Sequence, residues 1–226
     1  MARPLTGKER RRRLQAARVY LVLDTQVCEY SRLFQIAKQA VRTGVGIVQL
    51  RDKNGRLSDI LRWSEKFSCY LKDKALFIVN DRLDVAMAVD ADGVHLGQED
   101  FPVSAARRVL GWQRLIGVSC QSRNHVMVAE KDGADYIGFG SINKTLTKPD
   151  RLPMDRRILQ QVLTKARIPI FPIGGITSSN GQELFDLGAR RVAVTRAICL
   201  AEDAGAAVKY FCQLFVADSR SSGSRR

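Results

Sequence analysis

The chain has 226 residues, of which 45% are hydrophobic and 7% aromatic, and this is the composition of an ordinary globular protein. No apolar run approaches the ~20 residues of a membrane-spanning helix, and no long apolar stretch follows the first arginines, so neither a membrane protein nor a secretion signal is expected. The 5 cysteines are scattered, odd in number and without a CxxC pair, which argues against a disulfide framework or a thiolate zinc site and indicates a cytoplasmic protein.

The net charge of +14 is concentrated at the two ends of the chain. Residues 1–18 contribute +6 and residues 217–226 contribute +2. The basic block at 10–13 could contact nucleic acid or an acidic surface. We expect instead a solvated, flexible N-terminal extension over 1–18 and a disordered basic tail over 217–226, with no nucleic-acid partner.

Short apolar, β-branched runs alternate with amphipathic segments along the rest of the chain. The run at 19–23 predicts a strand, the segment at 30–43 has its apolar residues on one helical face, and Gly44 marks the end of that helix. Further strands are expected at 45–50, 76–79, 93–96, 115–118, 136–139, 168–173 and 191–194. The helices after them are expected at 57–72, 82–89, 103–110, 122–132, 154–165, 178–187 and 199–216.

Continuously apolar strands that alternate with helices are typical of a parallel sheet covered on both faces. Eight such units in a chain of this length predict a (β/α)8 TIM barrel, an α/β fold, as a single domain over 19–216. The alternative is an open, doubly wound sheet.

The active site of such a barrel lies where the strands end, and polar side chains follow every predicted strand except the first. Arg51, Lys53 and Lys148 are cations on different loops, and such a group suits a diphosphate. Asp81 and Asp100 are carboxylates on neighbouring loops, and with substrate phosphate and water they could bind Mg2+.

A second phosphate group is expected near the last strands. Gly174 and Gly175, with the loop after the eighth strand, predict a cradle of backbone N–H groups. Thr145 and Thr147 add hydroxyl donors. Each feature alone has a plain structural explanation, such as a helix cap at Asp81, and it is their conjunction that favours a site for two phosphate groups. His95 and His125 receive no role.

Several stretches resemble the thiamine-phosphate synthase family, in family order from about residue 19 to about 200. They are VQLRDK at 48–53, IVNDR at 78–82, DGVHLGQED at 92–100, IGVS at 116–119, GADYIG at 133–138, TLTK at 145–148 and IGGI at 173–176. The HLGQED segment, together with QLR and TxTK, is quite specific to that family, whereas the glycine pair is common elsewhere.

The resemblance implies a transferase that joins a hydroxymethylpyrimidine diphosphate to a plain or carboxylated thiazole phosphate and releases diphosphate, with Mg2+ as cofactor. It assigns catalysis to Arg51, Lys53, Ser119 and Lys148, and the metal to Asp81 and Asp100. The substrate-binding set is Gln49, Arg51, Asp52, Lys53, Asn80, Ser119, Thr145, Leu146, Thr147, Lys148, Gly174, Gly175, Thr195 and Arg196. A dissociative route is expected, because neutralising the diphosphate makes it a good leaving group without a protein nucleophile.

The chain departs from the family pattern at three places. In the loop after the sixth strand, Ser141, Asn143 and Lys144 replace Pro, Phe and Pro, and losing two prolines should loosen that loop. Gln121 replaces a histidine, and Arg196 replaces a small serine. Arg196 could add a phosphate contact or block the thiazole.

Two other functions stay open at this stage. A thiazole tautomerase-like enzyme would share the fold and the phosphate cradle but would need a base, which Gln121 cannot supply. A non-catalytic basic barrel would bind an acidic partner through residues 1–18, and it would stay folded when they are removed.

Overall fold

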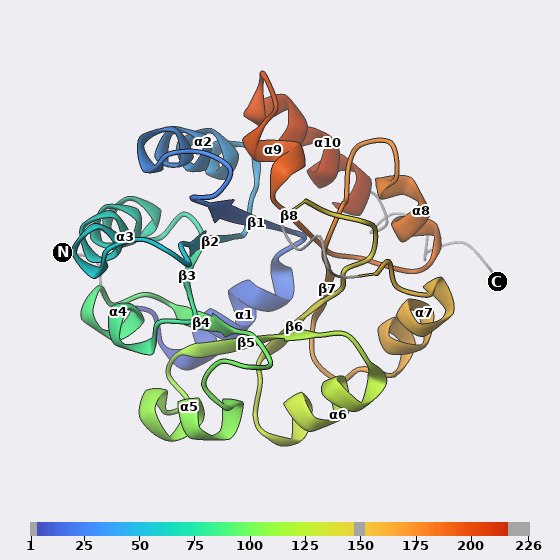
Figure 1. The fold of residues 1–226 in the computed structure, drawn as a ribbon, viewed down its shortest axis with the longest axis horizontal. Coiled ribbons are helices and arrows are strands. Elements are labelled where there is room, and N and C mark those ends of the chain that lie inside the picture. The colour runs from blue at the N-terminus through green and yellow to red at the C-terminus, as the bar shows by residue number, and fades with distance from the viewer. Residues whose placement is uncertain (1–3, 147–151, 217–226) are drawn as a thin grey trace.

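Eight parallel strands form one sheet inside a ring of helices (Figure 1) in the computed structural model, which describes residues 4–146 and 152–216. The strands are β1 (Val19–Asp24), β2 (Ile47–Arg51), β3 (Leu76–Asn80), β4 (Gly93–Leu96), β5 (Leu115–Cys120), β6 (Tyr136–Phe139), β7 (Ile170–Pro172) and β8 (Val192–Val194). Consecutive strands are neighbours from β1 to β7, and β8 pairs with β1. A parallel bridge between Ile173 and Ala193 joins the two edges, so the predicted barrel is confirmed and the open sheet is wrong.

Most of the helices lie close to their predicted positions, because the apolar stripe of each of these packs against the strands. They are α1 (Gly7–Ala16), α2 (Tyr30–Thr43), α3 (Leu57–Leu71), α4 (Leu83–Ala88), α5 (Val103–Leu110), α6 (Arg123–Lys131), α7 (Arg156–Lys165), α8 (Gly181–Asp186), α9 (Arg196–Cys199) and α10 (Ala204–Val216). Gly44 ends α2 in the left-handed region with a φ of 116°, as expected for a C-terminal cap. The helix predicted over 199–216 is present as α10 but begins five residues later, and the short α9 before it was not predicted.

The barrel has two buried layers on the two faces of its strands. The outer layer lies between strands and helices and includes Leu21, Val48 and Ile137. The inner layer fills the barrel with larger groups, among them Tyr20, Tyr136 and Phe171. Alternate side chains of one strand point to opposite faces, so neighbouring residues such as Tyr20 and Leu21 belong to different layers.

The expectation of a flexible N-terminal extension is corrected by α1, which lies at the N-terminal ends of the strands, behind them in Figure 1. A capping box begins the helix: the Thr6 side chain accepts from the Glu9 N–H, and the Glu9 carboxylate accepts from the Thr6 N–H. Leu14 is 1% exposed and belongs to the inner layer. This helix therefore closes the barrel at the N-terminal ends of its strands.

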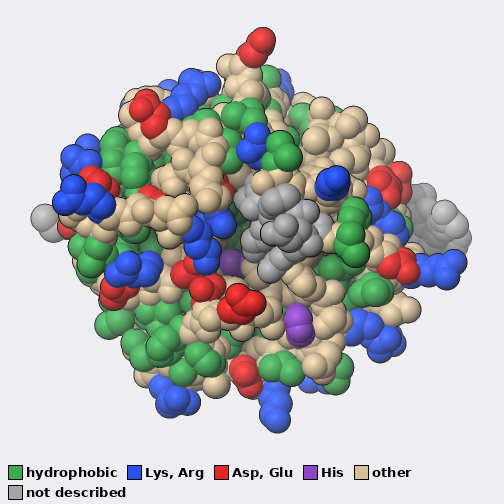
Figure 2. Space-filling model, viewed as in Figure 1, with side chains coloured by type: hydrophobic (Ala, Val, Ile, Leu, Met, Phe, Trp, Pro, Cys, Tyr) green, Lys and Arg blue, Asp and Glu red, His purple; other side chains and the backbone are tan. Residues whose placement is uncertain are grey.

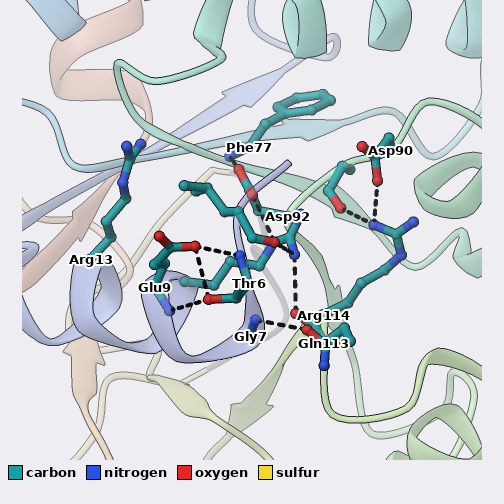
Figure 3. Close-up of polar contacts among 12 residues, drawn as sticks. Thr6, Gly7, Glu9, Arg13, Phe77, Asp90, Asp92, Gln113 and Arg114 are labelled. Carbon is teal, nitrogen blue, oxygen red and sulfur yellow. Dashed lines mark hydrogen bonds and ion pairs between the residues drawn. The ribbon is translucent and has the colours of Figure 1, made fainter. Parts of the chain in front are cut away.

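Polar contacts hold α1 in place (Figure 3). The Arg10 Nε donates to Asp92 Oδ1 at 2.8 Å, and the second oxygen of Asp92 accepts from the Phe77 N–H at 2.9 Å. The Gly7 N–H donates to the Gln113 side chain, as Figure 3 also shows. Outside that view, the Arg11 Nε lies 2.8 Å from Asp135 Oδ1. A barrel lacking residues 1–18 would leave these carboxylates without their arginine partners, so we expect the truncation to destabilise it.

Candidate active site

The carboxyl ends of the strands meet on one face of the molecule, where basic and acidic side chains surround a hollow that contains a histidine (Figure 2). The register explains the meeting, since Asp24 is level with Arg51 and Asn80 with His95. Side chains at the ends of neighbouring parallel strands are thereby brought together.

Lys53, Asp81 and Asp100 form a charged cluster on this face. The Lys53 Nζ contacts an Asp81 oxygen and lies 3.6 Å from Asp100 Oδ1. The other Asp100 oxygen accepts from the Gly97 N–H at 2.7 Å. Asp81 has a φ of 59°, a left-handed conformation that is uncommon outside glycine and is often found at functional sites.

The two carboxyl groups of this cluster differ in acidity. Burial, with a hydrogen bond to Asp100, raises the pKa of Asp81. Burial opposes ionisation of Asp100 too, but hydrogen bonds from Asp81, Gly97 and Lys53 outweigh it and lower the Asp100 pKa. The described residues contain no group of three or more His, Cys, Asp or Glu side chains placed to hold a metal. The carboxylates of Asp81 and Asp100, which both face the Lys53 ammonium group, nevertheless fit Mg2+, because this ion takes its other ligands from phosphate and water.

Arg51 has a partner that the sequence analysis missed. Its Nη1 donates to Asp24 Oδ2 at 2.7 Å, and the Asp24 side chain is fully buried. The first strand therefore also ends in a polar group, contrary to the expectation that it carries none. The signal was the aspartate directly after the apolar run 19–23. This carboxylate fixes the guanidinium at the mouth of the barrel.

Gln49, Asn80 and Ser119 lie deeper, at the top of the barrel interior. Gln49 accepts from the Tyr20 hydroxyl at 2.9 Å, and the Ser119 hydroxyl lies 3.0 Å from His95 Nε2. Asn80 is 8% exposed, and its buried side-chain Nδ2 has no hydrogen-bond partner among the residues that the structure describes. A buried amide donor without a partner is costly unless a ligand or water accepts from it, so Asn80 fits a ligand site.

Asp52 is directed to its own loop. One oxygen accepts from the Tyr30 hydroxyl at 2.5 Å, and the other accepts from the N–H groups of Asn54 and Gly55. Burial opposes ionisation, but these hydrogen bonds lower the pKa of Asp52. The carboxylate therefore shapes the loop that presents Arg51 and Lys53, and its predicted contact with substrate has no support in this arrangement.

A cavity of about 310 Å³ lies at the same barrel mouth as the charged cluster of Lys53, Asp81 and Asp100. This volume is at the lower end of the range for small-molecule sites. It is lined by seven predicted residues, Ser119, Thr145, Leu146, Gly174, Gly175, Thr195 and Arg196. Lys144 also lines it. Within residues 4–146 and 152–216, Lys144 and Arg196 form no ion pair. Two uncompensated cations at one cavity favour an anionic ligand. The predicted residues Thr147 and Lys148 lie outside the described residues.

The two glycines are required by close contact between loops. A Cβ atom on Gly175, whose φ is 59°, would lie 2.4 Å from the Lys144 carbonyl oxygen. One on Gly174 would lie 2.3 Å from the Ser141 hydroxyl oxygen. The loop after β6 is thus packed directly against the turn after β7, which brings their backbones to the cavity together.

Residues 19–198 match the sequence model of the family described as Thiamine monophosphate synthase. A thiamine-phosphate synthase of Chlorobium phaeovibrioides is 46% identical over 164 residues, covering 72% of this chain and 78% of that protein. The solved thiamine phosphate pyrophosphorylase from Pyrococcus furiosus is 32% identical with a TM-score of 0.81, and the match covers 92% of this chain and 98% of that one.

The chain belongs to the thiamine monophosphate synthase family. A further relative, the thiamine-phosphate synthase of Prochlorococcus marinus strain MIT 9303, is 41% identical over 202 residues, which are 88% of this chain and 57% of that protein. The chain thus spans little more than half the length of this relative. None of the helices in the described residues is both long and apolar enough to cross a membrane.

Two cysteines of this family member, Cys120 and Cys199, are buried and poor nucleophiles. Burial raises the pKa of Cys120, at the end of β5, to about 12, and burial likewise raises that of Cys199 to about 12. Both thiols are therefore protonated at neutral pH, and a protonated, buried thiol reacts poorly.

We expect iodoacetamide at about pH 8 to label the exposed Cys69 first and to leave Cys120 and Cys199 unmodified in the folded protein. Mass spectrometry of tryptic peptides, with a urea-unfolded sample as the control for full labelling, measures this. Rapid native labelling of Cys120 would show that the thiol is more acidic and accessible than its burial implies.

Proposed function

We propose that the chain catalyses the condensation of 4-amino-2-methyl-5-hydroxymethylpyrimidine diphosphate with a thiazole phosphate, giving thiamine phosphate and diphosphate in the cytoplasm. One observation carries the proposal: Arg51, Lys53, Asp81 and Asp100 gather at the same barrel mouth as the cavity lined by Gly175 and Arg196. The first half-site, formed by Arg51, Lys53, Asp81 and Asp100, is rich in cations, and the second half-site, the cavity, is lined by backbone groups. Two such half-sites suit two substrates that each carry phosphate.

In this mechanism the first half-site binds the diphosphate. Arg51, held by Asp24, and Lys53, held by the carboxylate pair, donate to phosphate oxygens and neutralise the charge that develops as the leaving group departs. Asp81 and Asp100 would hold Mg2+, which supplies further neutralisation of that charge when it is bound. Lys148 completes the catalytic set that the family resemblance predicts.

The pyrimidine would lie deeper, against Gln49, Asn80 and Ser119. The unpartnered Nδ2 of Asn80 can donate to a ring nitrogen, which orients the exocyclic methylene toward the cavity. The C–O bond to the diphosphate breaks first, and the aminopyrimidine delocalises the positive charge left on the methylene carbon. The thiazole nitrogen then attacks that carbon, so no protein nucleophile is needed and orientation supplies much of the rate.

The second half-site would bind the thiazole phosphate. Its donors are the backbone N–H groups near Gly175 and Thr195, the hydroxyl groups of Thr145 and Thr147, and the Arg196 side chain. Ser119 lines the same cavity, and its hydroxyl group is fixed by His95, so it lies between the two half-sites. The tautomerase alternative has no comparable support, because His95 is already hydrogen-bonded at both ring nitrogens, to Ser119 and to Tyr136.

The decisive experiment mixes the purified protein, Mg2+ and both substrates, and follows thiamine phosphate and released diphosphate by chromatography. We expect both products in equal amounts, and a large loss of rate when Mg2+ is replaced by a chelator. The Lys53→Met variant and a sample lacking the thiazole phosphate are the controls. Absence of product with the intact protein at any Mg2+ concentration would contradict the proposal.

A further inference from the structure

The carbonyl oxygen of Gly175 accepts hydrogen bonds from two side-chain amides. Asn180 Nδ2 donates to it at 2.9 Å, and Asn143 Nδ2 donates at 3.1 Å. Asn180 belongs to the same turn, where its Oδ1 also accepts from the Thr177 N–H. Asn143 comes from the loop after β6, so its bond joins two separate loops of the cavity.

Arg156, the first residue of α7, holds Asn143 in turn. Its Nη2 donates to Asn143 Oδ1 at 2.5 Å, and its Nη1 donates to the Ile142 carbonyl at 2.6 Å. Its Nε lies 2.5 Å from Glu183 Oε1 on α8. One guanidinium group thus connects the loop after β6 to the helix that follows the glycine turn, with the planar geometry that only arginine offers.

These contacts act on the cavity indirectly, because neither Asn143 nor Arg156 lines it. In a trans peptide the C=O and N–H bonds point in opposite directions, so fixing the Gly175 carbonyl also fixes the Ile176 N–H. Ile176 does line the cavity, as do Lys144 and Thr145 beside Asn143. The position of Asn143 therefore determines how the loop after β6 and the turn after β7 direct their hydrogen-bond donors into the cavity.

Further hydrogen bonds stiffen this loop at Ser141, one of the two positions where the family pattern has proline. The Ser141 hydroxyl donates to the Asn143 carbonyl at 2.8 Å, and the Asn143 N–H donates to the Gly174 carbonyl at 3.0 Å. Ser141 and Asn143 occupy positions where the family pattern has Pro and Phe. Hydrogen bonds in this chain thus take over the stiffening that proline would provide.

We propose that Arg156 and Asn143 are positioning residues that hold the two cavity loops in register and thereby set the affinity for the phosphate group of the thiazole substrate. The inference rests on the proposed function for the identity of that substrate. If the contacts are lost, the loops spend less time in the binding arrangement, and the apparent affinity falls in proportion.

The test compares Arg156→Met and Asn143→Ala with Arg157→Met, which removes the same charge from an exposed neighbour on the same helix. We expect the first two variants to raise the KM for the thiazole phosphate about tenfold, as for loss of a charge-assisted hydrogen bond, and to leave the KM for the pyrimidine diphosphate within about twofold. The double variant should be no worse than either single one, because both act through one contact.

A direct measurement separates this inference from the proposed activity. Calorimetric titration with inorganic phosphate, in the presence of saturating diphosphate to occupy the first half-site, reports the cavity without turnover, and Arg156→Met should weaken binding where Arg157→Met does not. Phosphate binding that behaves this way in a protein without synthase activity would support the positioning role and contradict the proposed function. The inference is overturned if Arg156→Met matches Arg157→Met, if both KM values rise together, if the two effects add, or if the intact protein binds no phosphate.

Discussion

Replacing Asp100 with asparagine should lower kcat by at least about 100-fold and leave the barrel folded. The change keeps the shape of the side chain and removes the charge that, with Asp81, faces Lys53 at the barrel mouth. Loss of one preorganised charge-stabilising group typically costs a factor of 10²–10³ in rate. If these carboxylates hold Mg2+, the concentration of Mg2+ that gives half-maximal rate should also rise strongly.

The control for this prediction is Glu99→Gln, which removes a carboxylate from the adjacent, exposed position. Circular dichroism and urea unfolding check that both variants fold. Asp81→Asn should resemble Asp100→Asn, because asparagine also tolerates the left-handed backbone that Asp81 adopts. A folded Asp100→Asn protein with the kcat and Mg2+ dependence of Glu99→Gln would remove the metal assignment.

Replacing Arg10 with methionine should lower the free energy of unfolding by about 3–5 kcal/mol, the cost of leaving a buried charge without its partner. Arg10 is 4% exposed, and its guanidinium donates to Asp92 and to the carbonyl groups of Leu5 and Gln113. Methionine fills a similar volume, so the loss reports the polar contacts. Urea unfolding measures it, and Arg12→Met, at an exposed position of the same helix, should cost less than about 0.5 kcal/mol.

The size of the Arg10 effect should depend on pH. Burial raises the pKa of Asp92, and Arg10 partly opposes that rise. Because the folded-state pKa lies above the unfolded-state value, ionised Asp92 is a cost to folding that protonation relieves as the pH falls. Without Arg10 the pKa of Asp92 should rise further. The difference in unfolding free energy between Arg10→Met and the wild type should therefore be largest at about pH 8 and smaller at about pH 5. A difference that does not change with pH would contradict this account.

The positions of the elements follow from local pattern, and the sequence predicts them well. The helix over 103–110 and the strands over 93–96 and 136–139 have the predicted bounds, because each contains its own apolar periodicity. The last helix, predicted over 199–216, begins only at Ala204, and the short α9 before it was not predicted. The Thr6–Glu9 capping box is a local signal for the start of α1, whereas the high positive charge of residues 1–18 favours a solvated extension.

The candidate site divides in the same way. Lys53, Asp81 and Asp100 were predicted together because each follows a strand, and parallel strands end at one edge. Asp24 and Asp52 show the limit of that reasoning. Asp24 contacts Arg51 only because β1 pairs with β2 in this register, and the direction in which Asp52 points is set by hydrogen bonds within its loop.

The barrel, the edge at which its chemistry lies and the family of the chain can be predicted from the amino-acid sequence, since they follow from periodicity and motifs within short stretches. The partner of each charged side chain depends on the packed structure. Arg10 meets Asp92 across 82 residues and Arg156 meets Glu183 across 27, and such pairs depend on how the barrel closes. Local patterns determine which face of an element is buried, whereas the contact between two distant side chains exists only once the elements between them have packed.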